Sequence, residues 1–175
     1  MGTDKGLLLQ NDKTWSKYIA DLLNSILPEV YISLRHGQAA AYQSCFETSR
    51  MIFDQPGIPA KGPLTGILSA HKTYPDKNWF VIACDIISIN EGTISRLIDS
   101  YLENPVYHAC LYKNQNRFEP LCAIYSAAWL AELLASSHTL SNFSLQRNLP
   151  LNKSLILDAG VNDILTLKNY NTKMD

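Results

Sequence analysis

The sequence has no long hydrophobic run. Its longest uninterrupted apolar stretch is the six residues 79–84, far short of the roughly twenty that a helix needs to cross a bilayer. The first residues, Met1 to Gly6, are followed by three leucines and by no small-residue cleavage site, so a secretory signal is not expected. We therefore expect a cytoplasmic protein with no transmembrane segment and no membrane partner.

The sequence also lacks an excess of charge of either sign. Fifteen Lys and Arg residues stand against sixteen Asp and Glu residues, the formal net charge is −1, and neither sign forms a long block. A nucleic acid is therefore not expected as a partner, and any phosphate binding must be local. With 175 residues, 46% of them apolar, the chain can bury the core of one domain, which we place at residues 1–175.

Several signature motifs are absent. The cysteines at 45, 84, 110 and 122 form no C-x-x-C pair, which argues against a disulfide framework and a structural zinc site and favours free buried thiols. The chain has no G-x-x-x-x-G-K-[ST], no G-x-G-x-x-G and no G-x-S-x-G pattern. A P-loop, a dinucleotide fingerprint and a nucleophile elbow are therefore not expected. A Ser/His/Asp or Cys/His hydrolase arrangement stays open.

The sequence does contain alternating helix-like and strand-like segments. Apolar residues at 15, 18, 19, 22, 23, 26 and 27 have helical spacing and stop before Pro28, which predicts an amphipathic helix. The run 79–84 shows no alternation, as is typical of a parallel strand buried on both faces, and it ends at Asp85. Further helices are predicted from Pro63 to about His71, after an Asn90 cap, over 126–134 and over 141–149, with weak helical character over 38–47. Further strands are predicted over 30–34, 51–53, 106–112, 118–125 and 155–157.

This order of segments predicts a three-layer α/β sandwich around a mainly parallel, Rossmann-like sheet. Chains of this kind usually open with the central strand of the sheet. Here the sequence begins with a loop-like hexapeptide and reaches a helix by about residue 14. A strand is therefore expected to be missing at the front of the chain.

Polar residues that end buried strands are the first candidates for a site, because ligands bind outside the carboxyl ends of parallel strands. Asp85 ends the run 79–84 and could hold Mg²⁺, which prefers oxygen ligands. A polar strand end or a helix cap explains it equally well. Asp54 ends the run 51–53, where an ordinary turn aspartate is the simpler interpretation. Lys5, beside Gly6, could place a positive charge next to phosphate oxygens.

Six segments spread over nearly the whole chain form a recognisable series. In chain order they are MGTDKGLL (1–8), VYISLR (30–35), Asp54 followed by GPLTGIL (62–68), ACD (83–85), EPLCAIY (119–125) and NYNT (169–172). Together they resemble the motifs of the molybdenum cofactor guanylyltransferase family, the MobA-like branch of the nucleotidyltransferases. The first segment is similar to the second half of that family's opening motif, L-A-G-G-x-S-x-R-M-G-x-D-K-G-L-L.

The resemblance implies a nucleotide-diphospho-sugar transferase-like fold and transfer of GMP from GTP to molybdopterin, giving molybdopterin guanine dinucleotide and pyrophosphate with Mg²⁺ as cofactor. It assigns the catalytic roles to Lys5, at the triphosphate, and to Asp85, at the metal. Attack in line on the α-phosphorus needs little covalent help, so catalysis would consist of positioning and of neutralising the developing charge. The resemblance also allows for partner proteins in cofactor delivery.

The same resemblance assigns binding roles to further residues. Gly2, Ser33 and Asp54, with Lys5 and Asp85, would contact the nucleotide. Asn169 and Asn171 would lie in the half of the cleft that receives the pterin substrate.

Two departures from the family pattern bear on these assignments. The L-A-G-G-x-S-x-R half of the opening motif has no counterpart, so we expect the full protein to carry a strand and a glycine-rich loop ahead of Met1. Ile86 and Ile87 stand where the family often has Met-Pro. A related cytidylyl- or sugar-nucleotide transferase is the alternative enzyme, and a non-catalytic α/β domain that binds a nucleotide or a partner is the alternative from another class.

Overall fold

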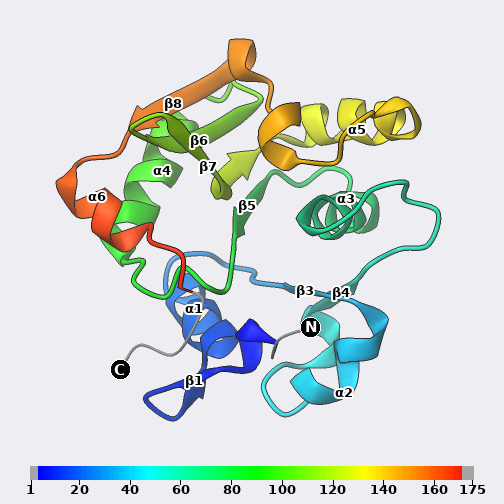
Figure 1. Cartoon of the computed structure of the whole chain (residues 1–175), viewed down its shortest axis with the longest axis vertical. Helices are drawn as coiled ribbons and strands as arrows, with labels where there is room; N and C mark the ends of the chain where they lie inside the picture. Colours follow the sequence, from blue (N-terminus) through cyan, green and yellow to red (C-terminus); the bar gives the residue numbers. More distant parts are fainter. Residues whose placement is uncertain (1–3, 171–175) are drawn as a thin grey trace.

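Eight strands and six α-helices alternate along residues 4–170, the part of the chain that the computed structural model describes (Figure 1). The strands are β1 (Leu9–Gln10), β2 (Lys13–Thr14), β3 (Ile32–Leu34), β4 (Met51–Phe53), β5 (Trp79–Ile82), β6 (Ala109–Asn114), β7 (Arg117–Tyr125) and β8 (Ser154–Asp158). The helices are α1 (Trp15–Asn24), α2 (Ala39–Tyr42), α3 (Pro63–Thr73), α4 (Glu91–Glu103), α5 (Ala127–Ser136) and α6 (Val161–Thr166). The predicted α/β class is confirmed.

Local signals in the sequence explain where the main helices begin. The Thr14 side chain accepts a hydrogen bond from the Lys17 amide at the start of α1, and the Asn90 side chain accepts one from the Thr93 amide at the start of α4. Both bonds satisfy an amide that has no partner inside its helix. Helix α3 begins with Pro63, whose fixed φ suits the first turn. The predicted helices at these three places are confirmed.

The larger sheet has the strand order β5-β7-β6-β8. Strands β6 and β8 are parallel, whereas β7 is antiparallel to both of its neighbours. The prediction that residues 79–84 pair as a parallel strand is therefore wrong for the edge that is bonded. The hydrophobic run predicts that a strand forms but does not predict its partner. The partner is β7, which returns from β6 through a tight hairpin and inserts between β5 and β6. Strand β5 is also only partly buried.

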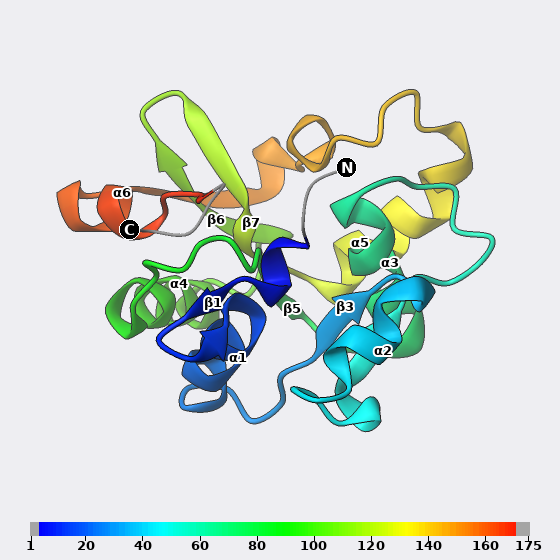
Figure 2. The same ribbon diagram turned by 60° about the horizontal axis from the view of Figure 1, so that its bottom comes forward.

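The smaller sheet consists of β3 and β4, which are parallel in the register Ile32↔Met51. It lies beside β5 in Figures 1 and 2, but no ladder joins β3 to β5 among residues 4–170. The Tyr31 and Trp79 rings lie 5.7 Å apart at the start of the two strands. At the other end, Asp4 and Lys5 contact residues that follow β3 and β5, respectively. The two strands therefore run in the same direction.

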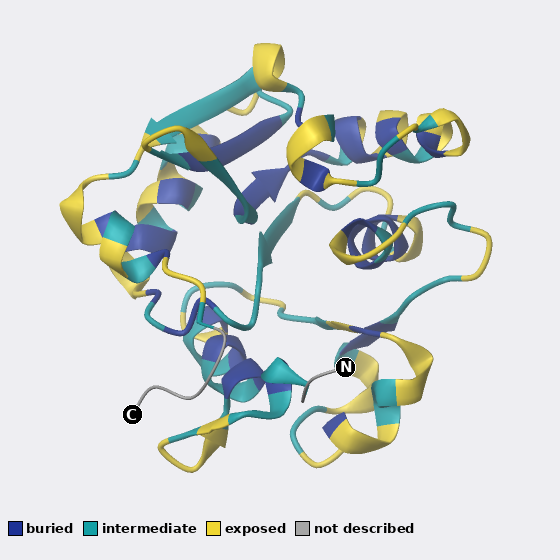
Figure 3. Ribbon diagram, viewed as in Figure 1, coloured by how far each residue is buried: buried dark blue, intermediate teal, exposed yellow. Residues whose placement is uncertain are grey.

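Helices cover both faces of the larger sheet, which gives the predicted three layers (Figure 3). Cys110 and Tyr112 of β6 point to the face covered by α1 and α4, while Ala109 and Leu111 point to the face covered by α3 and α5. This alternation is the period-two pattern of a strand buried on both sides. These four residues of β6 are fully buried, so the core is centred on this strand.

Other predictions have mixed outcomes. Residues 141–149, predicted as an α-helix, contain only a 3₁₀ turn over Leu145–Asn148. The reason is local competition, since the side chains of Asn142 and Asn148 bond to backbone groups of the same segment.

The β1–β2 hairpin and α6 were not predicted. All four cysteines are free thiols; Cys110 and Cys122 are buried, as predicted, whereas Cys45 and Cys84 are only partly buried. Within residues 4–170, the helices are too short or too polar to cross a bilayer.

Candidate active site

Lys5 and Asp85, which are far apart in the sequence, meet at the carboxyl end of β5. Their side chains form an ion pair with 2.9 Å between Lys5 Nζ and Asp85 Oδ2. Asp85 is the less exposed partner, with 18% of its side chain accessible against 38% for Lys5. The Asp85 carbonyl accepts a hydrogen bond from the Tyr170 amide, and the Ser88 hydroxyl donates one to the Tyr170 hydroxyl. The segment after α6 therefore holds the main chain around Asp85 in place.

Asp4 positions the turn that carries Lys5. Its carboxylate accepts hydrogen bonds from the Gly6 amide (3.1 Å), the Tyr42 hydroxyl (3.0 Å) and the Gln38 side-chain amide (2.6 Å). A Cβ added at Gly6 would overlap the Tyr42 hydroxyl, so the turn packs directly against this ring. Sequence reasoning missed Asp4, Gln38 and Tyr42. The contacts of Asp4 span 34 and 38 residues, and nothing in their local sequence signals such pairing.

Ser33 and Asp54 lie together on the β3–β4 side. Both lie close to Gly66 in α3, because a Cβ added at Gly66 would overlap the Ser33 hydroxyl and lie 3.8 Å from an Asp54 carboxylate oxygen. The sequence folds this way because Asp54 follows β4 directly and its amide bonds to the carbonyl of Leu34 at the end of β3. Burial raises the pKa of Asp54, and the nearby positive charge of Arg35 opposes that rise.

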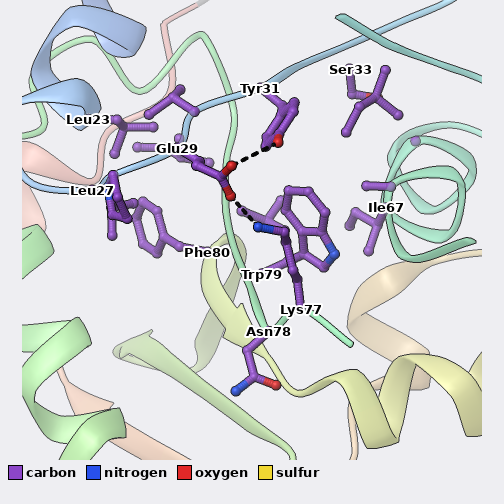
Figure 4. A pocket seen from close by; sticks show the side chains of 17 residues that line it. Leu23, Leu27, Glu29, Tyr31, Ser33, Ile67, Lys77, Asn78, Trp79 and Phe80 are labelled. Atoms are coloured by element: carbon purple, nitrogen blue, oxygen red, sulfur yellow. Dashed lines mark hydrogen bonds and ion pairs between the residues drawn. The ribbon is translucent and has the colours of Figure 1, made fainter. Parts of the chain in front are cut away.

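Two cavities that share lining residues lie beside the two groups. One, of about 250 Å³, is lined by Asp4, Gln38, Cys84 and Ser33, among others. The second, of about 380 Å³, lies against Ser33 and Gly66 and continues between β3 and β5 (Figure 4). Ser33 lines both cavities, whereas Lys5, Asp54 and Asp85 line neither, so the cavities adjoin the candidate site through the neighbours of these residues.

The structure leaves some assignments untested. Gly2 and Asn171 lie outside the described residues. Asn169 is exposed and directly precedes Tyr170, whose amide bonds to Asp85. Its proposed role at a pterin substrate stays a prediction.

Asp85 suits a magnesium ion that is shared with a substrate. Among residues 4–170 there is no group of three or more His, Cys, Asp or Glu side chains that could hold a metal by themselves. Mg²⁺ commonly takes one or two carboxylates and fills its remaining positions with water and substrate phosphates. A single, partly buried carboxylate beside a lysine matches that donor set.

Comparison with known proteins identifies relatives of this chain. Residues 1–151 match the MobA-like NTP transferase domain. A molybdenum cofactor biosynthesis bifunctional protein from Synechocystis is 33% identical over 128 residues, which is 72% of this chain and 35% of that protein. A probable molybdenum cofactor guanylyltransferase from Methanothermobacter thermautotrophicus is 28% identical over 73% of this chain and 65% of that protein. The chain thus spans about a third of the Synechocystis relative.

Solved structures show the same fold. Molybdopterin-guanine dinucleotide biosynthesis protein A from Archaeoglobus fulgidus has a TM-score of 0.76 at 18% identity, over 98% of this chain and 86% of that chain. A Mycobacterium tuberculosis protein solved as a complex with manganese has a TM-score of 0.56 at 14% identity, over 93% of this chain and 90% of that chain. With the sequence match over most of its length, this chain belongs to the MobA-like NTP transferase family.

Proposed function

We propose that the protein transfers GMP from GTP to molybdopterin and releases pyrophosphate. The observation that carries this proposal is the Lys5–Asp85 pair at the carboxyl end of β5. A cation and a carboxylate at one strand end can neutralise a triphosphate directly and through a metal. The names of the Synechocystis and Methanothermobacter relatives support molybdenum cofactor as the substrate class.

The proposed reaction makes one phosphoanhydride bond and breaks another. A phosphate oxygen of molybdopterin attacks the α-phosphorus of GTP, and the bond from that phosphorus to the bridging oxygen of the β-phosphate breaks. Lys5 turns from Asp85 to the triphosphate and offsets the charge that develops on the leaving pyrophosphate. Asp85 would hold Mg²⁺, which would supply Lewis-acid stabilisation of the phosphate oxygens. The manganese complex of the Mycobacterium tuberculosis neighbour supports a divalent ion in this fold.

The remaining roles follow from the family resemblance. Ser33 and Asp54, which converge at Gly66, bind the nucleotide together with Gly2. Asn169 and Asn171 bind the pterin substrate, and Asn169 directly precedes Tyr170, whose amide bonds to the Asp85 carbonyl. The cytoplasm stays the expected compartment.

The test is a direct assay of the purified full protein with GTP, molybdopterin and Mg²⁺, in which molybdopterin guanine dinucleotide and pyrophosphate are measured. We expect both products in equal amounts. A matched pair of variants gives the control, since Asp85→Asn removes the proposed metal ligand while Asp99→Asn removes an exposed carboxylate on α4. Loss of product in the first variant and retention in the second supports the assignment.

Thermal-shift titration with GTP, CTP and ATP separates the alternatives. A ligand at 100 times its Kd stabilises a protein by roughly 2.7 kcal/mol, which is easily detected. A larger shift with CTP would favour a cytidylyltransferase. Nucleotide binding without any product would favour a non-catalytic binding domain, and no shift with any nucleotide would refute the proposal.

A further inference from the structure

The side-chain amide of Gln38 is bonded at both of its ends. Its oxygen accepts hydrogen bonds from the main-chain amide of Arg35 at 2.9 Å and from Arg35 Nε at 3.3 Å. Its nitrogen donates a hydrogen bond of 2.6 Å to Asp4 Oδ2. The two Arg35 groups can only donate and the ionised Asp4 carboxylate can only accept, so these partners fix which way the amide points. No charged or apolar side chain could make both sets of bonds.

The two ends of this amide lie in different parts of the candidate site. Arg35 directly follows β3, and its positive charge acts on Asp54, where it opposes the rise in pKa that burial causes. Asp4 precedes Lys5, whose amino group pairs with the carboxylate at the end of β5. Gln38 therefore connects the nucleotide group to the group that carries the ion pair.

Bonds to both oxygens fix the plane of the Asp4 carboxylate. One oxygen accepts from the Gly6 amide at 3.1 Å and from the Tyr42 hydroxyl at 3.0 Å, while the other accepts from Gln38. The Gly6 bond attaches the turn to the carboxylate, so the carboxylate and the main chain of Lys5 move together. A shift of Gln38 is therefore passed to the turn from which the Lys5 side chain extends.

We propose that Gln38 is a positioning residue for Lys5, which sets the place of the lysine amino group relative to Ser33 and Asp54. A triphosphate bound beside β3 and β4 has to reach this amino group, and a misplacement of about 1 Å can cost about 100-fold in rate. Gln38 acts through Asp4 rather than on the substrate. The inference rests on the proposed role of Lys5 at a triphosphate, but not on the identity of the acceptor.

An exchange of the two bonded groups in the full protein tests the proposal. Gln38→Glu sets a carboxylate against the Asp4 carboxylate, and Asp4→Asn sets an amide nitrogen against the Gln38 amide nitrogen. In the double variant the new amide at position 4 donates to the new carboxylate at position 38, which still accepts from Arg35. Gln43→Glu, at an exposed position directly after α2, is the control for the added charge.

The proposal predicts a pattern in the steady-state rates with GTP. Each single variant should lose about tenfold in kcat/KM, the usual effect of one lost hydrogen bond. The double variant should recover to within about threefold of the parent protein, and Gln43→Glu should behave like the parent protein. Single variants without a loss overturn the proposal. A double variant that stays as slow as the single variants, while its Tm equals that of the parent protein, also overturns it.

A second comparison separates positioning from support of the fold. A protein with Lys5→Met has no lysine to position, so adding Gln38→Glu to it should change kcat/KM by less than about twofold. A further tenfold loss in that background would show that Gln38 supports the fold alone, and the proposal would be wrong.

Binding of inorganic tripolyphosphate with Mg²⁺ keeps the inference separate from the proposed reaction. Calorimetric titration should show the same pattern in Kd, with binding about tenfold weaker in each single variant and recovered in the double variant. This pattern in a protein that forms no product would refute the proposed reaction and support the positioning role. Equal binding by all variants, or no binding by the parent protein, refutes the positioning role.

Discussion

The two sheets of this protein differ in how they are supported. Strand β6 of the larger sheet is bonded on both edges, and residues 109–112 are fully buried between two helical layers. Among residues 4–170, strands β3 and β4 are bonded only to each other. The buried cluster beneath them consists of Leu34, Tyr42 and Met51. One half of the molecule therefore has a deep core, and the other depends on a small one.

The candidate site is divided in the same way. Asp85 follows a strand of the larger sheet, whereas Ser33 and Asp54 belong to the smaller one. Asp4 reaches across this division, because it contacts Gln38 and Tyr42 while its neighbour Lys5 contacts Asp85. A reaction that needs both groups therefore depends on how rigidly the two sheets are held relative to each other. This division predicts that stability and activity respond differently to changes on the two sides.

The largest effect on stability is expected in the core of the larger sheet. Leu111→Ala leaves a cavity among fully buried side chains and should lower the free energy of unfolding by about 4–5 kcal/mol. Leu34→Ala makes the same change on β3, where fewer neighbours surround the cavity, and should cost about 2–3 kcal/mol. Urea unfolding of both variants measures the difference. Equal costs would contradict the unequal support of the two sheets.

The next largest effect is expected on catalysis at the end of β5. Asp85→Asn keeps the size of the side chain but removes its charge, so turnover should fall by about 100-fold or more. The lost ion pair with Lys5 is partly exposed and should change stability by less than about 1 kcal/mol. Steady-state rates and Tm are measured together. Turnover close to that of the parent chain would remove Asp85 from the mechanism.

Much of the fold could be predicted from the sequence because its signals are local. The helical spacing after Trp15, the Asn90 cap and Pro63 each act within one or two turns, and all three predicted helices are present. Strand pairing is different, because the partner of a strand depends on distant segments. The run 79–84 therefore predicted strand β5 but not its antiparallel pairing with β7.

The candidate site shows the same limit. Asp54 and Asp85 could be identified because polar residues after apolar runs mark the carboxyl ends of strands. Their separation into two groups could not be predicted, since it depends on the division of the sheet. Asp4, Gln38 and Tyr42 were missed because their contacts join segments that no sequence pattern relates.

A smaller effect is expected at Gly66, where the two nucleotide-binding candidates meet. Gly66→Ala displaces the Ser33 hydroxyl, and loss of one hydrogen bond to GTP should weaken binding about tenfold. Stability should change by less than about 1 kcal/mol, because alanine favours the helix. Calorimetric titration with GTP measures the effect. Ser33→Ala combined with Gly66→Ala should bind no more weakly than either single variant, and additive losses would show that Ser33 is not the group displaced.

The smallest effect is expected from Asp54→Asn, and its sign depends on pH. Burial raises the pKa of Asp54 in the folded protein. Between the ordinary pKa and the raised one the folded state binds more protons than the unfolded state, so the contribution of Asp54 to stability falls as pH rises through that window. Above the window Asp54→Asn should therefore raise Tm by roughly 1–2 °C, and below it the difference should vanish. The same variant should bind GTP more weakly, since charged groups that cost stability are typical of binding sites. Thermal unfolding of Asp54→Asn at pH 3, 5 and 7, with Asp99→Asn as the control, tests the effect on stability. Titration with GTP at pH 7 tests the effect on binding. If Asp54→Asn were less stable than the parent protein at pH 7, Asp54 would serve the fold rather than the site.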